Sequence, residues 1–150
     1  MKFLNKKKAR ILVSVFIFSI VSLSIIGLDY WKNGERAKQV MRDLESESAT
    51  IEPLPQATIL AHYASYRPRQ AWVISKYQTS LNFSDIRAYY DGELAKQGWS
   101  FRNEKQLRHW GRDVGSMVTY YCKGDYTISL EYSGEKPGYN WAYSLSLSWG

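Results

Sequence analysis

The pattern of apolar and polar positions changes near residue 28. A nearly continuous apolar run ends there, apolar and polar residues are mixed beyond it, and the two patterns predict different kinds of element. Residues Ile11 to Leu28 form a run of 18 positions without a charged side chain. As an α-helix this run would be about 27 Å long, close to the roughly 30 Å hydrocarbon core of a bilayer. We therefore expect a transmembrane helix over residues 11–28, in contact with lipid along its length.

A cleavable signal peptide and a buried soluble helix are the alternatives for this run. Ser22-Leu23-Ser24 is the nearest approach to a small-x-small cleavage site. However, apolar residues continue past it, and Tyr30 and Trp31 follow where interfacial aromatic residues mark a membrane edge. These features favour retention of the run as a membrane anchor.

Basic residues are unevenly distributed around the apolar run. Residues 1–10 carry five Lys or Arg and no acidic residue, whereas residues 29–48 carry four. This bias predicts a basic cytoplasmic segment, a single pass through the inner (cytoplasmic) membrane and an extracytoplasmic C-terminal domain. The other 140 residues hold 15 basic and 14 acidic side chains. Because the positive charge is confined to the N-terminus, we expect no nucleic-acid partner.

Two segments separate the expected anchor from the rest of the chain. Residues 29–48 predict a polar juxtamembrane helix, and residues 49–56 predict an extended linker because they contain two prolines. The helix has one apolar stripe, which predicts either a short homodimer seam or, as the favoured alternative, a helix lying on its own domain. The stripe consists of Ala37, Val40, Met41 and Leu44.

Residues 57–150 form the predicted domain. Strand-like segments occur at 57–66, 71–79, 99–110, 117–123, 126–133 and 141–149. Ser84 predicts a helix start and Gly98 a helix end. Clear period-two alternation means strands buried on one side only. We therefore expect an α+β fold, in which the N-terminal transmembrane helix is followed by a small antiparallel sheet covered by one main helix, a two-layer sandwich.

The alternation also assigns side chains to faces. In residues 141–149 the aromatic and leucine side chains are expected to face the core, and Ser144, Ser146 and Ser148 to face outward. In residues 117–123 the same rule places Val118, Tyr120 and Cys122 on the apolar face. The lone cysteine is then expected to be buried and inert. Trp141, Tyr143 and Trp149 can also stack on sugar rings, but core packing is the favoured interpretation.

The stretch from Tyr77 to Trp99 resembles small domains that follow an N-terminal anchor in many bacterial envelope proteins. The shared feature is a helix of the form aromatic-Tyr-x-x-x-Leu-x-x-x-Gly-Trp, which here comprises Tyr89, Tyr90, Leu94, Gly98 and Trp99. The resemblance covers roughly residues 53–150. It implies the fold and an envelope location, and it carries no catalytic residue to this chain.

Motifs for catalysis and for cofactors are not found in the sequence. The two histidines, His62 and His109, are far apart and lack nearby cysteine or acidic clusters, so we expect no metal site. No glycine-rich turn of a phosphate-binding type is present, and we expect no cofactor. The chain is therefore expected not to be an enzyme.

One basic segment is the candidate binding surface. It can meet an anionic glycan, a lipid headgroup or an acidic partner, or it can be a solvated edge strand whose charges prevent aggregation. The segment contains Lys105, Arg108, His109, Trp110 and Arg112. We expect a membrane-anchored binding or assembly module that holds an envelope protein or an anionic envelope component. The alternative is an envelope enzyme or enzyme inhibitor that uses loops 103–116 and 133–140.

Overall fold

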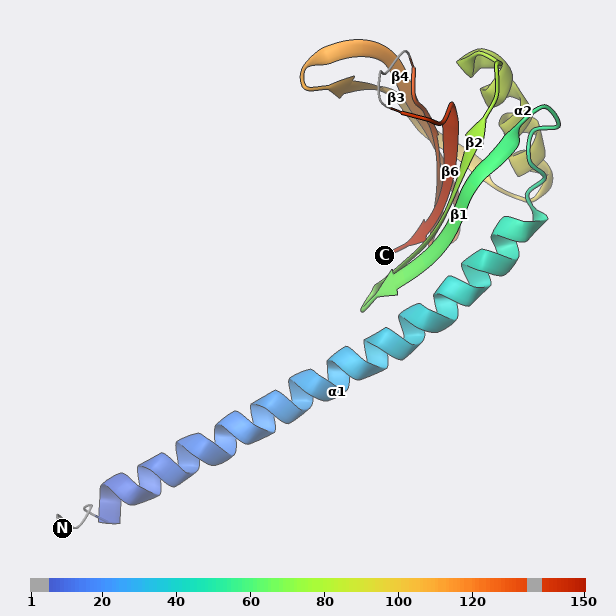
Figure 1. Cartoon of the computed structure of the whole chain (residues 1–150). Helices are drawn as coiled ribbons and strands as arrows, with labels where there is room; N and C mark the ends of the chain where they lie inside the picture. Colours follow the sequence, from blue (N-terminus) through green and yellow to red (C-terminus); the bar gives the residue numbers. More distant parts are fainter. Residues whose placement is uncertain (1–5, 135–138) are drawn as a thin grey trace.

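The computed structural model describes the backbone of residues 6–134 and 139–150 (Figure 1). It describes their side chains from residue 14 onward, except at 20, 23, 25, 26, 29 and 109. A long helix comes first, and a sheet and a second helix follow it. The elements are α1 (Lys6–Thr50), β1 (Thr58–Arg67), β2 (Gln70–Gln78), α2 (Phe83–Lys96), β3 (Ser100–His109), β4 (Arg112–Lys123), β5 (Tyr126–Tyr132) and β6 (Tyr143–Trp149).

The transmembrane helix expected over residues 11–28 is not found, and this part of the fold prediction is wrong. Among the residues that the structure describes, no helix is long and apolar enough to cross a membrane. Residues 11–28 belong instead to a single helix of 45 residues, Lys6–Thr50. No proline interrupts this stretch. Backbone hydrogen bonding therefore continues from its apolar part into its polar part without a break.

The six strands form one antiparallel sheet in the order β1-β2-β6-β5-β4-β3. The prediction that one main helix covers this sheet is also wrong. The C-terminal half of α1 and the whole of α2 pack on the same face, because both contribute apolar side chains to one core. That core includes Leu44 from α1, Ile86, Tyr90 and Leu94 from α2, and Val73, Ile128, Leu130, Leu145 and Leu147 from the strands.

The apolar stripe of α1 lies against the sheet of its own chain. Ala37 and Leu44 are completely buried, and Val40 and Met41 are partly buried beside the core. Arg36 extends this contact, since its guanidinium lies 5.1 Å from the centre of the Trp149 ring. This is the favoured arrangement that the stripe predicted, a helix lying on its own domain.

The segment after α1 is packed and does not hang free. Ile51 and Leu54 are buried in the core, and the Tyr89 hydroxyl lies within hydrogen-bonding distance of the carbonyl oxygens of Glu52 and Pro53. The end of α1 is also tied to α2, because the Gln97 side-chain amide donates to the Thr50 carbonyl at 2.9 Å. The prolines predicted an extended linker over residues 49–56, but residues 49 and 50 belong to α1 and residues 55 and 56 form a turn. The contacts just described hold this segment in place.

Helix α2 begins two residues earlier than the sequence suggested, because its N-cap is Asn82 and not Ser84. Asn82 is the N-cap, and its side-chain oxygen accepts a hydrogen bond from the Asp85 backbone N–H at 3.0 Å. The helix ends as predicted at Gly98, whose φ is 82°. The Trp99 N–H donates to the Leu94 carbonyl at 3.0 Å, which is the outer bond of a Schellman motif. This turn folds Trp99 back so that its side chain is buried.

Three tyrosines hold α2 to the centre of the sheet. The hydroxyls of Tyr90 and Tyr143 are 3.0 Å apart, and the rings of Tyr77 and Tyr143 stack with centroids 4.8 Å apart. Burial raises the pKa of Tyr143 to about 12 and raises the pKa of Tyr90 further. These shifts have a structural cause, since the two hydroxyls satisfy each other inside the core.

Two leucines of α1 test whether its C-terminal half packs on the sheet while its N-terminal half does not. We expect Leu44→Ala to lower the free energy of unfolding by roughly 2–5 kcal/mol, because it removes a buried core side chain. Leu28→Ala is the matched control, since Leu28 lies on the same helix and is 66% exposed. Urea unfolding of the full chain in mild detergent, followed by tryptophan fluorescence, measures both. Equal effects of the two substitutions would contradict the packing described here.

Candidate functional site

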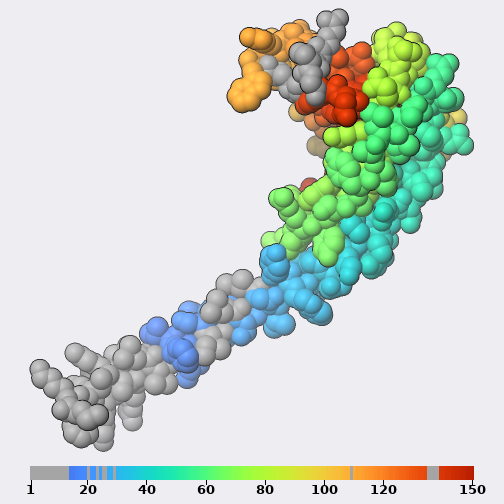
Figure 2. All heavy atoms as spheres, in the orientation of Figure 1, coloured from blue at the N-terminus to red at the C-terminus, as the bar shows by residue number. Residues whose placement is uncertain are grey.

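The second face of the sheet carries neither of the helices that the structure describes, and it is the main candidate surface. Figure 1 shows the sheet curving away from α1 and α2, so that this open face is concave. In Figure 2 the hollow lies between the β3–β4 hairpin, drawn in orange, and the β1–β2 hairpin, drawn in green. One-sided burial is common in antiparallel sheets, and the curvature here converts the uncovered side into a trough.

Small hydroxyl side chains form the floor of this open face. Strand β6 contributes Ser144, Ser146 and Ser148, as the alternation predicted. Strand β5 contributes Thr127 and Ser129, which are the register partners of Ser148 and Ser146. Because paired residues of neighbouring strands share a face, these hydroxyls make a strip two strands wide.

The face assignment predicted for β4 is reversed. Tyr121 pairs with Ile128, and Thr119 pairs with Leu130, so both face the core. Val118, Tyr120 and Cys122 lie on the open face, and Cys122 is only partly buried. The sequence misled because both alternating sets of this strand contain large side chains, and the register with β5 decides between them.

Aromatic rings and cations form the borders of the open face. Lys76 lies over the rings of Tyr63 and Trp141, at 5.9 and 5.7 Å from their centres. On the opposite border, Lys105 lies 5.1 Å from the centre of the Tyr120 ring. A third pair, Arg67 and Trp72, lies toward the β1–β2 turn with a separation of 5.6 Å. Such pairs hold long cationic side chains in place and leave their hydrogen-bond donors accessible.

The charge of the open face is positive. Its cations are the Lys76, Lys105 and Arg67 side chains just described. Glu131 is the register partner of Ser144 and adds one carboxylate on this side. A trough of hydroxyls bordered by cations and rings suits an extended partner that carries acidic groups.

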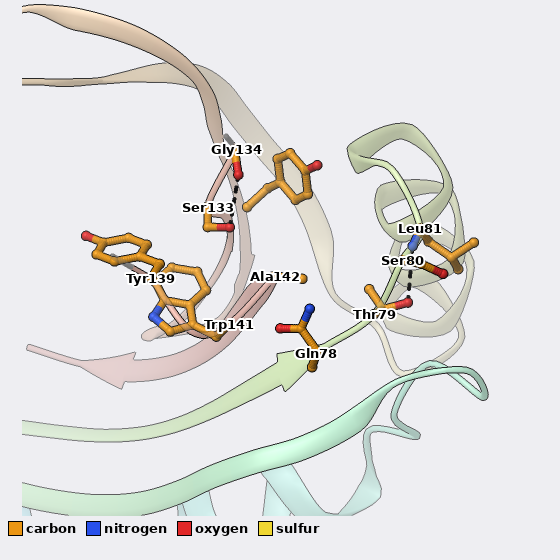
Figure 3. A pocket seen from close by; sticks show the side chains of 10 residues that line it. Gln78, Thr79, Ser80, Leu81, Ser133, Gly134, Tyr139, Trp141 and Ala142 are labelled. Atoms are coloured by element: carbon orange, nitrogen blue, oxygen red, sulfur yellow. Dashed lines mark hydrogen bonds between the residues drawn. The ribbon is translucent and has the colours of Figure 1, made fainter. Parts of the chain in front are cut away.

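A pocket of about 470 Å³ lies at one end of the open face (Figure 3). Its wall includes the stacked rings of Tyr139 and Trp141, whose centroids are 4.6 Å apart. On the other side, the Thr79 hydroxyl accepts a hydrogen bond from the Leu81 N–H at 3.3 Å. Trp141 also contacts Lys76, so the pocket opens beside the trough. These groups offer stacking and hydrogen bonds to a ligand.

Residues 103–116 were predicted as a loop, but they form most of the β3–β4 hairpin instead. They meet Gly134 of the second predicted loop, 133–140, whose residues 135–138 lie outside the described part. Gly134 has a φ of 66°, and a Cβ there would lie 2.1 Å from the Val114 carbonyl oxygen, so glycine is required. A pocket of about 460 Å³ lies at this junction. Its carboxylate, Asp113, accepts hydrogen bonds from the Gln106 side chain at 2.7 Å and the Gly115 N–H at 2.9 Å. These bonds give Asp113 a role in shaping the loop.

Histidines and acidic residues do not gather into a metal site within the described residues. Among these residues, no group of three or more His, Cys, Asp or Glu side chains has a suitable arrangement. His62 lies beside Ser75, with 2.8 Å between its Nδ1 and the serine hydroxyl. This contact accounts for His62 as a structural side chain of the β1–β2 pair.

The predicted basic segment is divided by the structure. Lys105 points to the open face, whereas Trp110 lies at the tip of the β3–β4 hairpin and is fully exposed. Arg108 and Arg112 flank this tip and are exposed. The backbone of His109 pairs with Arg112, and its side chain lies outside the described residues. The hairpin tip therefore combines a large aromatic side chain with two cations.

The turn at the hairpin tip is strained by its tryptophan. Trp110 has a φ of 52° and Gly111 a φ of 76°, the combination found in type I′ turns. Asn is common at the first position, whereas a bulky L-residue there costs roughly 1–2 kcal/mol. A strained and exposed tryptophan at a tip is an expected feature of a docking residue, since aromatic anchors dominate many interfaces.

Comparison of the chain with protein family models, curated proteins and solved structures gives no match. The resemblance of Tyr77 to Trp99 to small envelope domains therefore stays a prediction.

The strain at the tip can be tested directly. We expect Trp110→Asn to raise the free energy of unfolding by about 1 kcal/mol, because Asn accepts positive φ more readily. Thermal unfolding followed by circular dichroism measures the change, with Arg112→Gln as a control that leaves the turn backbone unchanged. If Trp110→Asn has a lower free energy of unfolding than the unaltered chain, the tryptophan stabilises the fold and does not strain the turn.

Proposed function

We propose that this protein is a membrane-attached binding module, which holds an acidic or anionic envelope partner in the open face of its sheet. The observation that carries the proposal is the contrast between the two halves of α1. Phe16 and Phe18 in the N-terminal half are 67% and 74% exposed, whereas Leu44 in the C-terminal half is completely buried. An apolar segment of this kind is unfavourable in water and needs a covering environment.

Three features support lipid as that environment. The exposed apolar side chains lie around the helix and include Val15, Phe16, Ile17, Phe18, Val21 and Leu28. Basic residues precede this segment in the sequence, and Tyr30 and Trp31 follow it with 67% exposure each. Cations and aromatic side chains next to an apolar segment are favourable in the lipid headgroup region.

The open face and the β3–β4 tip supply the binding function. The rings and cations along the trough provide stacking and charge-assisted hydrogen bonds, and Trp110 provides an exposed anchor. Attachment to a membrane raises the effective concentration of a weak module near its partner. We propose that the domain lies on the extracytoplasmic side.

Membrane attachment has a direct test. We expect the full chain to remain with membranes after alkaline extraction and to float with lipid in a density gradient. Replacement of Phe16, Phe18 and Leu28 by Ser should move it to the soluble fraction, because it removes exposed apolar surface. A variant in which Ser14, Ser24 and Ser48 are each replaced by Thr controls for the number of changes. Recovery of the unaltered chain in the soluble fraction contradicts attachment.

Partner binding and sidedness are tested separately in cells. A photo-crosslinking residue at position 110 or 120 should capture a partner, whereas one at Lys96, whose side chain is 72% exposed on the helical side, should not. Equal adducts from all three positions would argue against the open face as the binding surface.

Alkaline phosphatase fused after Gly150 should be active, and an expressed but inactive fusion would contradict the extracytoplasmic location.

A further inference from the structure

The β1–β2 turn lies beside α1 close to the point where its exposed apolar residues end. Figure 1 shows the β1–β2 hairpin extending along α1 toward the N-terminal half of that helix. A pocket of about 440 Å³ separates the two, lined by Tyr30, Trp31, Gly34 and Glu35 of α1 and by Tyr66, Arg67 and Pro68 of the hairpin. Only the folded chain brings these two segments together.

The position of this pocket follows from the helix geometry. The residues of α1 that line the pocket run from Tyr30 to Glu35, two to seven residues after Leu28, which corresponds to about 3 to 10 Å along the helix axis. The headgroup layer of a bilayer is roughly 5–8 Å thick on each side of the hydrocarbon core. If lipid covers the apolar segment up to Leu28, an arginine side chain at the hairpin turn reaches the headgroup phosphates.

The side chains around the pocket have the chemistry of a headgroup site. Tyr30, Trp31 and Tyr66 are exposed aromatic residues with polar edges, which favour the membrane interface. Arg67 lies over the Trp72 ring. A ring contact does not use the N–H donors of a guanidinium, which can bind a phosphate in a bidentate manner.

The turn keeps an additional cation despite backbone strain. Arg69 follows Pro68 and has a φ of 69°, a conformation that glycine adopts at lower cost. A proline followed by a residue with positive φ matches a type II turn, in which glycine is usual at the second position. Two arginines therefore flank Pro68 at the end of the molecule that faces the apolar segment.

We propose that this pocket binds the phosphate of an anionic phospholipid headgroup. The inference rests on the proposed membrane attachment. Glu35 is the carboxylate among the lining residues, and it opposes an anion electrostatically. Arg67 and Glu35 thus make opposite contributions, so their substitutions should change lipid binding in opposite directions.

The test uses the full chain reconstituted in vesicles of phosphatidylcholine with a minority of phosphatidylglycerol. Lipids retained by the protein after mild detergent extraction are counted by native mass spectrometry. We expect Arg67→Gln to lower the retained phosphatidylglycerol about fivefold, since one arginine near an anionic surface contributes about that factor. Glu35→Gln should raise retention, which a folding defect cannot do. Arg112→Gln makes the same charge change at the opposite end of the sheet and should leave retention unaltered.

Three other outcomes would contradict the site, its assignment to a lipid or membrane attachment. Equal phosphatidylglycerol retention by Arg67→Gln, Arg112→Gln and the unaltered chain overturns the proposed site. Competition by soluble glycerol phosphate at the same concentration as the lipid would show a site for free phosphate, and it would overturn the assignment to a lipid. Failure of the unaltered chain to float with vesicles of either composition contradicts membrane attachment itself, and that failure is recorded before any lipid is counted.

Discussion

The packing of the C-terminal half of α1 against one face of the sheet determines the positions of the other functional features. Leu44 and Ala37 are buried against strands that lie far from them in the sequence, and α2 completes the same core. Because the apolar side chains of β5 and β6 point to this face, the opposite face receives the serines and threonines between them. The helices on one side and the open trough on the other have a single cause.

The same packing fixes the direction of the exposed part of α1. The helix runs along the sheet and continues past the β1–β2 turn without a break. The apolar N-terminal half therefore projects from the end of the domain where Arg67 and the C-terminus also lie. The β3–β4 tip with Trp110 lies at the far end of the curved sheet. The exposed apolar residues of α1 and the exposed Trp110 thus lie at opposite ends of the molecule.

Local patterns in the sequence predicted the separate elements well. The alternating segments before and after α2 became strands close to their predicted bounds, and Gly98 ended the helix because its conformation is local. The serines of β6 were correctly placed outward. Local patterns failed where distant contacts decide the outcome. The register between β4 and β5 reversed the predicted face of Cys122, and burial against the sheet gave α1 a covering role that a single main helix had been expected to fill.

The candidate site was less predictable than the fold. Trp110 belonged to the predicted basic segment, and the positive φ of the turn explains why it is exposed at a tip. The segment itself did not remain together, since alternation in a strand sends Lys105 to the open face and leaves Arg108 and Arg112 at the tip. The pocket between α1 and the β1–β2 turn joins residues more than thirty positions apart. A single sequence gives no signal for such a juxtaposition, although the aromatic pair Tyr30 and Trp31 marked one half of it.

The continuous helix and the packed segment that follows it have a mechanical consequence. A flexible tether would let the domain tumble freely, but here Ile51, Leu54 and the Tyr89 hydroxyl hold the connection to the core. The sheet and α1 consequently move as one rigid unit. Any tilt or axial rotation of the N-terminal half of α1 turns the whole concave surface through the same angle. The orientation of α1 therefore sets the direction in which that surface points.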